Sequence, residues 1–287
     1  MGKTAWQKRI RRAEVLAAQH SFAVEILGFY VHIARFQEGL YQQMEHHAAD
    51  GGCEWDKRSA GVPLAVFQEQ AWASRLPPGP QDAGYTILTA SFPQFLAVVQ
   101  KRGPERLAQV AHELRSQPPT ACFELLQAVW SDHGEPPSNP EGFLALTFLQ
   151  PYAEFVRSQS QLHLEGYSHS LCPVCSRRAA LGVLRPLGDG AQRRLVCGFC
   201  LAEWEFRRVV CPGCGQEDHA KLPVYTAETF PHIRVECCDS CQIYIKSIDL
   251  AKNGLAEPVV DELASIPLDL WAQEHGYAKL HPNMFGI

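Results

Sequence analysis

The chain has 287 residues and a formal net charge of −5, and 46% of its residues are hydrophobic while 20% are charged. This apolar share is sufficient for a buried core and excludes a compositionally disordered chain. The negative net charge disfavours a generally basic protein that coats nucleic acid. At roughly 150 residues per domain, the length suits one large domain or two ordinary ones.

The basic N-terminus, MGKTAWQKRIRR, lacks the apolar stretch and the cleavage site of a secretory signal. A short transit peptide is an alternative, but we interpret this segment as the polar start of a surface helix. No run in the sequence is long and apolar enough to cross a bilayer, which takes about 20 residues. We therefore expect a cytoplasmic protein without membrane insertion.

Residues 1–165 are predicted to form an all-helical bundle domain. Apolar side chains recur at helical spacing in one long segment: Ile26, Phe29, Tyr30, Ile33, Phe36 and Leu40. Further apolar segments, also expected to be helical, lie at 62–75, 91–101, 104–116, 120–132 and 139–163. Clusters of glycine and proline separate them, and short connections between helices are typical of an antiparallel bundle.

The character of the sequence changes near Tyr167. Short runs rich in β-branched and aromatic residues follow at 193–197, 203–211, 221–227, 233–238 and 243–250. Residues 252–287 return to a helical pattern and end in a tail that we expect to pack back on the body. The predicted fold class is therefore α+β, with a helical domain (1–165), a metal-ribbon region (166–251) and a C-terminal helix with its tail (252–287).

Cysteine is concentrated in the ribbon region, where nine of the eleven cysteines lie between Cys172 and Cys241. The other two, Cys53 and Cys122, are isolated and are not expected to carry chemistry. In a secreted chain this density would indicate disulfides. In a long chain without a secretory signal it indicates metal ligation or redox chemistry.

Eight of these cysteines form four Cys-x-x-Cys pairs with a duplicated spacing, in a first copy at 172–200 and a second at 211–241. Two cysteines in such a pair can present both thiolates to one metal ion, and a second pair on a hairpin completes a tetrahedron. We predict two metal sites. Site 1 comprises Cys172, Cys175, Cys197 and Cys200, and site 2 comprises Cys211, Cys214, Cys238 and Cys241.

Two alternatives to this assignment stay open at the level of sequence. The pairs could be cross-braced, the first with the third and the second with the fourth. Cys237, which precedes Cys238 directly, could replace it as a ligand, although only Cys238 keeps the two-residue spacing to Cys241.

Four thiolates suit Zn²⁺ or a rubredoxin-type iron, and the donor set does not choose between them. We expect the ions to act as structural staples for a region of short strands with little core. A redox-active iron is the alternative. Catalysis at the metal is disfavoured because four thiolates leave no open coordination position.

Motifs for nucleotide binding, metalloprotease and serine-hydrolase chemistry are absent from the sequence, which predicts a protein that is not an enzyme. Between residues 166 and 251, ten basic and nine acidic side chains give a net charge of +1. A nucleic-acid-binding zinc ribbon is a weaker alternative, because this charge provides no electrostatic footprint for phosphates.

Several segments resemble the FdhE family of formate dehydrogenase accessory proteins. The resemblance runs through CPVC at 172–175, RLVCGFCLAEWEFRRVVCPGC at 194–214 and CDSCQIYIKSID at 238–249, and extends to 27–37, 143–155 and 261–287. One departure is Ser176, where the family commonly has glycine after the first pair. Glycine is favoured there because the turn requires a positive φ.

The resemblance implies a non-catalytic, chaperone-like assembly factor that binds the catalytic subunit of a respiratory formate dehydrogenase in the cytoplasm, before that enzyme is exported. It also implies rubredoxin-like iron at the cysteine sites, with zinc as the alternative. The rival hypothesis is an electron-transfer or redox-sensing protein with two tetrathiolate irons. The oligomeric state, homo-oligomers included, stays open.

Overall fold

The computed structural model describes residues 3–49, 83–132, 137, 139–159, 166–283 and 285–286. Cys53 and the helix expected at 62–75 lie outside the described residues. The chain divides into two compact units, the first containing 1–10, 28–163 and 174–176 and the second containing 11–27, 164–173 and 177–287. The predicted α+β fold class is confirmed, with an N-terminal helical region, a sheet region carrying two clusters of four cysteines, and a C-terminal helical segment.

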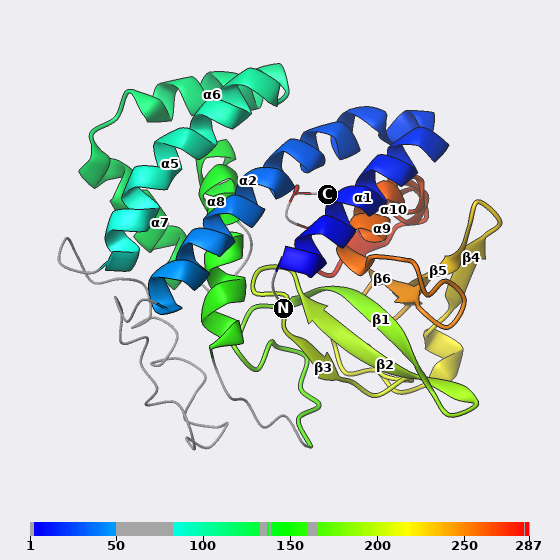
Figure 1. Ribbon diagram of the computed structural model, residues 1–287. Helices are drawn as coiled ribbons and strands as arrows, with labels where there is room; N and C mark the ends of the chain where they lie inside the picture. Colours follow the sequence, from blue (N-terminus) through cyan, green and yellow to red (C-terminus); the bar gives the residue numbers. More distant parts are fainter. Residues whose placement is uncertain are drawn as a thin grey trace. The chain divides into compact units, whose positions relative to one another are not determined.

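The first unit is helical (Figure 1). Its helices are the start of α1 (Lys3–Gln19), most of α2 (Val24–Ala49), α5 (Ala83–Arg102), α6 (Glu105–Arg115), α7 (Pro119–Ser131) and α8 (Pro140–Ser158). Helix α5 begins at Ala83, whereas the apolar pattern predicts a helix only from residue 91, because hydroxyl residues interrupt the pattern before that point. The hydroxyl of Thr89 donates to the carbonyl oxygen of Tyr85 at 2.7 Å, so the helix satisfies this polar group itself.

Aromatic side chains fill the core of the first unit. Phe92, Phe95 and Phe148 are buried, and the ring centroids of Phe92 and Phe148 lie 4.9 Å apart. Gln37 on α2 donates its side-chain amide to the carbonyl oxygen of Thr147 on α8 at 2.7 Å. This bond satisfies a buried polar group and ties the two helices together.

The second unit is built on one seven-stranded sheet with the strand order β3-β2-β1-β6-β5-β4, and β7 also pairs with β6 (Figure 1). The strands are β1 (Ala179–Leu187), β2 (Gly190–Cys197), β3 (Glu203–Glu205), β4 (Val224–Ala227), β5 (Phe230–Cys238), β6 (Ile243–Asp249) and β7 (Ala278–Lys279). A short 3-10 turn, η3 (His219–Lys221), precedes β4, and another, η1 (Ser21–Ala23), connects α1 to α2.

Strand β1 joins the two cysteine copies into one sheet and was not expected from the sequence. It pairs antiparallel with β2 of its own copy and parallel with β6 of the other copy, Gly182 lying opposite Ser247. A Cβ atom at Gly182 would lie 2.2 Å from the Ser247 hydroxyl oxygen and 3.2 Å from its Cβ, so Ser247 would have to shift to make room. Glycine therefore permits the close approach of the two strands where the copies meet.

The C-terminal segment packs on one face of this sheet as two helices, α9 (Pro258–Ala264) and α10 (Ile266–Glu274). The helical pattern is interrupted near Ser265 because Pro267 lies in the first turn of α10, where it lacks the backbone N–H that a continuous helix needs. Leu268 and Ala272 on α10 belong to the same buried cluster as Ile233 and Val235 on β5.

A buried ionic cluster fastens these helices to β6. The ammonium group of Lys246, whose side chain is fully buried, lies 2.5 Å from a carboxylate oxygen of Asp269 and 3.1 Å from one of Glu262. Lys279 pairs with the same two carboxylates. Burial alone raises the pKa of Glu262, but the two ammonium groups outweigh burial and lower it to about 2.

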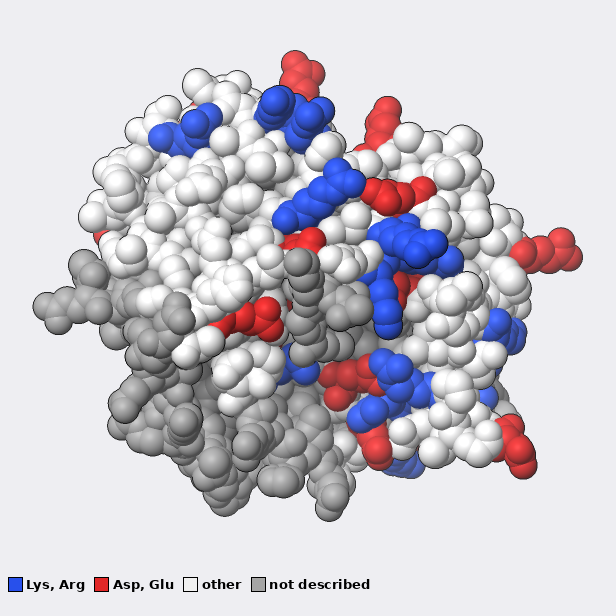
Figure 2. Space-filling model, in the orientation of Figure 1, with Lys and Arg blue, Asp and Glu red and all other residues white. Residues whose placement is uncertain are grey.

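Charge on the surface is mixed. In the view of Figure 2, Lys and Arg side chains (blue) are interspersed with Asp and Glu side chains (red) on the part of the surface that is not grey. Within the part of the chain that the structure describes, no helix combines the length and the apolarity needed to cross a bilayer.

The low pKa of Glu262 predicts a loss of stability in acid. The stabilisation that ionised Glu262 gives the folded chain is fully present above 4.5, the pKa of this carboxyl in the unfolded chain, and is lost as the pH falls towards 2. Glu262→Gln should lose about 3–5 kcal/mol of unfolding free energy at pH 7, and the loss should shrink in acid. Urea unfolding of both chains from pH 7 to pH 2.5 measures the difference. Glu274→Gln, at an exposed position on α10, is the control and should follow the parent; a constant difference at every pH would contradict the assignment.

Candidate metal centres

Each cysteine pair lies in a tight turn, which we call a knuckle. The first knuckle precedes β1, and the second begins at Cys197, the last residue of β2. The third lies between β3 and η3, and the fourth begins at Cys238, the last residue of β5. Each copy thus supplies one knuckle from a loop and one from the end of a strand.

The four knuckles share one backbone conformation. The residue directly after the second cysteine has a positive φ in every knuckle: Ser176 (58°), Leu201 (51°), Gly215 (76°) and Gln242 (56°). Among the residues that the structure describes, Ser176, Leu201 and Gln242 are the only non-glycine residues with a positive φ. The repeated turn shows that the copies are related in structure as well as in spacing, and it confirms the conformation expected at Ser176.

Hydrogen bonds close the knuckles. The amides of Cys172, Cys197 and Cys211 each donate to the carbonyl oxygen five residues later, at 2.8, 3.0 and 2.9 Å. Inside the third knuckle, the amide of Gly213 lies 3.3 Å from the sulfur of Cys211. Donors of this kind stabilise a thiolate because they point at its negative charge.

The eight predicted ligands come together in two groups of four. Cys172, Cys175, Cys197 and Cys200 form the first group, which we call tetrad 1; Cys211, Cys214, Cys238 and Cys241 form the second, tetrad 2. Within each tetrad all sulfur atoms lie within 4.8 Å of one another. This grouping joins the first Cys-x-x-Cys pair with the second and the third with the fourth, as predicted for sites 1 and 2. The cross-braced alternative is wrong.

The sulfur spacing fits a tetrahedral ion. The Cys211–Cys241 and Cys214–Cys238 sulfur pairs are each 3.7 Å apart, and the Cys172–Cys200 pair is 3.5 Å apart. With metal–sulfur bonds of about 2.3 Å, the corners of a tetrahedron lie about 3.8 Å apart. A disulfide bond would require about 2.05 Å, and every cysteine in the described residues is free. The arrangement therefore suits Zn²⁺ or a rubredoxin-type iron, held by the four sulfurs of each tetrad.

Electrostatics also favour a cation at tetrad 2. Burial raises the pKa of Cys211, and burial together with the neighbouring cysteines raises the pKa of Cys241. At Cys238 burial acts in the same direction, but the amides of Cys241 and Ser240 outweigh it and lower the pKa. Four thiolates in contact repel one another, and a bound cation removes this repulsion.

Cys237 does not belong to tetrad 2. Successive side chains of β5 point to opposite faces of the sheet, so Cys237 lies in the hydrophobic cluster with Tyr244, while Cys238 lies in the tetrad. Burial and the nearby acidic groups raise the pKa of Cys237 to about 12, which keeps it a neutral thiol. Cys122, the other isolated cysteine that is described, donates weakly to the carbonyl oxygen of Leu114 at 3.5 Å.

Two arginines lie near the centres, and each is adjacent to another arginine in the sequence. The guanidinium of Arg177 lies 4.2 Å from the ring centroid of Phe199, which is inside the second knuckle. Arg193 on β2 is buried and contacts the carbonyl oxygens of Arg207 and Val210, each at 3.1 Å. The adjacent arginine pairs in the sequence were the available signal, but pairs of that kind are usually solvated.

The common knuckle turn predicts that alanine lowers the stability of the protein at one glycine, Gly215, and leaves it nearly unchanged at another, Gly254. Gly215→Ala should cost about 1–2 kcal/mol of stability, because a left-handed residue other than glycine carries that penalty. A Cβ atom at Gly215 would have no neighbour within 4 Å, so the cost is purely conformational. Gly254→Ala is the matched control: its φ is not positive and its Cβ meets a single atom at 3.9 Å. Chemical denaturation of the metal-loaded chain measures both, and equal effects would contradict the explanation.

Metal analysis should find two ions per chain after anaerobic loading. Cys197→Ser should reduce the content to one, whereas Cys237→Ser should keep two because this thiol lies in the apolar cluster. Removal of both ions should lower the thermal unfolding midpoint, since closed sites of this kind contribute folding free energy. Inductively coupled plasma mass spectrometry and calorimetry provide the readouts. Full occupancy in Cys197→Ser would contradict the assignment.

Comparison with known proteins gives a consistent result. The family model described as the FdhE C-terminal domain matches residues 209–285. A curated FdhE homolog from Aquifex aeolicus is 32% identical over 145 residues, which are 50% of this chain and 51% of that protein. One from Haemophilus influenzae is 32% identical over 143 residues, 50% of this chain and 46% of that protein. The matched segment therefore spans about half the length of these curated relatives.

A solved structure shares the fold over nearly the whole chain. The crystal structure of the FdhE protein from Pseudomonas aeruginosa has a TM-score of 0.62 and 21% sequence identity, and the match covers 97% of this chain and 94% of that one. At this identity the likeness establishes the fold alone. The family model, the curated relatives and this fold together agree with the resemblance to the FdhE family seen in the sequence: the C-terminal part of the chain is similar to the FdhE C-terminal domain, and the chain shares the fold of an FdhE protein.

Proposed function

We propose that this chain is a non-catalytic, cytoplasmic assembly factor for a respiratory formate dehydrogenase. It binds the catalytic subunit of that enzyme, in a chaperone-like manner, before export. The observation that carries the proposal is the similarity to FdhE proteins, supported by the two cysteine tetrads that the FdhE-like segments contain.

In this proposal both tetrads hold an ion of iron or zinc and the protein performs no chemistry on formate. Four sulfurs around each site leave no position for a substrate or a water molecule on the metal. The ions instead fix four knuckles, and with them the ends of β2 and β5. The product of this arrangement is a rigid surface for a protein partner.

An electron-transfer or redox-sensing protein is the second candidate, and one observation favours it. Cys214 of tetrad 2 is exposed, so an electron acceptor can approach this sulfur closely. Reversible one-electron titration of a ferric tetrathiolate, which absorbs visible light, would support this function. A nucleic-acid-binding role receives no comparable support, because ion pairs such as Arg185–Glu203 and Arg207–Glu217 neutralise the arginines of the ribbon region.

Anaerobic affinity capture from the native host, grown with formate, tests the proposal. A formate dehydrogenase catalytic subunit should co-purify with the parent chain and be lost with Cys197→Ser/Cys200→Ser, because tetrad 1 no longer closes. Formate-dependent dye reduction by membranes of a deletion strain should be restored by the parent and not by the double variant. Cys122→Ser, a cysteine outside both tetrads, is the control and should behave like the parent.

Capture of a folded chain without any dehydrogenase subunit would contradict the assembly function. Full dye reduction in a strain carrying only the double variant would separate the tetrads from the function, even if the partner were captured. The metal content of each purified variant, measured in parallel, shows whether the substitution acted on the tetrad as intended.

A further inference from the structure

The two tetrads differ in their access to solvent. All four cysteines of tetrad 1 are fully buried, each with an exposed fraction of 0%. In tetrad 2, Cys214 is exposed and Cys241 is partly exposed, while Cys211 and Cys238 are buried. The duplicated sequence therefore builds one closed centre and one that reaches the surface.

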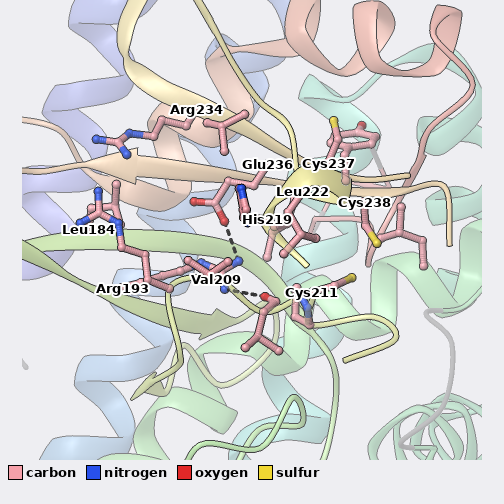
Figure 3. Close-up of a pocket in the computed structure, with 17 residues that line it drawn as sticks. Leu184, Arg193, Val209, Cys211, His219, Leu222, Arg234, Glu236, Cys237 and Cys238 are labelled. Carbon is pink, nitrogen blue, oxygen red and sulfur yellow. Dashed lines mark hydrogen bonds and ion pairs between the residues drawn. The ribbon is translucent and has the colours of Figure 1, made fainter. Parts of the chain in front are cut away.

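A cavity borders Cys211 and Cys238, the two buried cysteines of tetrad 2. It has a volume of about 250 Å³ and is lined by Cys211 and Cys238, together with residues of β1, β2, β5 and β6 (Figure 3). Its apolar lining includes Leu184, Leu222 and Ile243. Every cysteine of tetrad 2 thus faces either solvent or this cavity.

The charged lining of the cavity is mainly basic. Arg193, Arg208 and Arg234 line it, against the single carboxylate of Glu236. Arg193 is paired with Glu236 and Arg234 with Asp249, each through one ion pair. Arg208 is exposed, and among the described residues no carboxylate forms an ion pair with it. Its guanidinium lowers the electrostatic cost of bringing an anion towards a tetrathiolate centre, which is itself negatively charged.

We propose that tetrad 2 is an exchangeable metal centre and that tetrad 1 is a permanent one. An anionic ligand, a carboxylate or a thiolate, reaches the metal of tetrad 2 either beside the exposed Cys214 or through the basic cavity that Cys211 and Cys238 line. One metal–ligand bond forms as one metal–thiolate bond breaks, and the released thiolate takes a proton from water. At tetrad 1 the same reaction first requires local unfolding, because no sulfur is accessible. This inference rests on the proposal that both tetrads hold a metal ion.

Chelator competition on the full chain, loaded with two zinc ions, tests the inference. The coloured chelator 4-(2-pyridylazo)resorcinol should remove one ion at least about tenfold faster than the other, because only one site must open first. Cysteines freed in the fast phase are alkylated with N-ethylmaleimide and mapped by mass spectrometry. Among the eight tetrad cysteines, those labelled first should be the ones of tetrad 2, and this assignment needs no variant that might fail to fold.

A charge-reduced variant tests the part played by the cavity. Arg208→Ala should slow zinc removal by the anionic chelator EDTA about two- to fivefold at low salt, because steering by an exposed charge is of this order and is screened by salt. Removal by the neutral chelator tetrakis(2-pyridylmethyl)ethylenediamine should not change. Arg106→Ala, an exposed arginine on α6, is the control and should not affect either chelator.

The possible outcomes separate this inference from the proposed function. Loading of fewer than two ions would remove the metal part of the proposed function and the inference with it. Two ions lost in a single phase, or first labelling at tetrad 1, would overturn the exchangeable centre and leave the assembly function intact. An equal effect of Arg208→Ala on both chelators would overturn the role of the basic lining.

Discussion

The sheet region depends on the convergence of four sulfur atoms at each of two points. A tetrahedral ion requires sulfurs about 3.8 Å apart, and the chain meets this requirement with four turns of one type, each followed by a residue of positive φ. Strands β2 and β5 end where these turns begin. The position of the tetrads therefore sets where strands stop, and the sheet is arranged around that constraint.

Two further contacts turn two small metal ribbons into one unit. Parallel pairing of β1 with β6 joins the copies, and glycine at 182 leaves room for the Ser247 side chain on the neighbouring strand. The buried ammonium of Lys246 then fastens α9 and α10 to the same strand through Glu262 and Asp269. Tetrad 2 lies next to this strand, since β6 begins two residues after Cys241.

Alternation along β5 gives its two faces different roles. Ile233 and Val235 pack in the cluster that includes α10, whereas Arg234, Glu236 and Cys238 line the cavity; Cys237 belongs to the cluster and also borders the cavity. One strand thus contributes to the core, to a basic cavity and to a metal centre. Two copies with similar cysteine spacing thus differ in solvent access, because the residues around the second tetrad leave it accessible and those around the first bury it.

The sequence alone determined the eight tetrad cysteines, the helical character of the N-terminal region and the α+β class, because these features are encoded in local spacing and periodicity. It did not reveal β1, whose alanines, glycine and Pro186 have weak strand propensity and which is stabilised by neighbours on both sides. Whether Cys237 or Cys238 joins the tetrad depended on the face of β5 to which each side chain points, since both are buried. The unequal exposure of the tetrads and the ionic cluster at Lys246 were also decided only by tertiary structure, since burial and long-range ion pairs join residues that are distant in the chain.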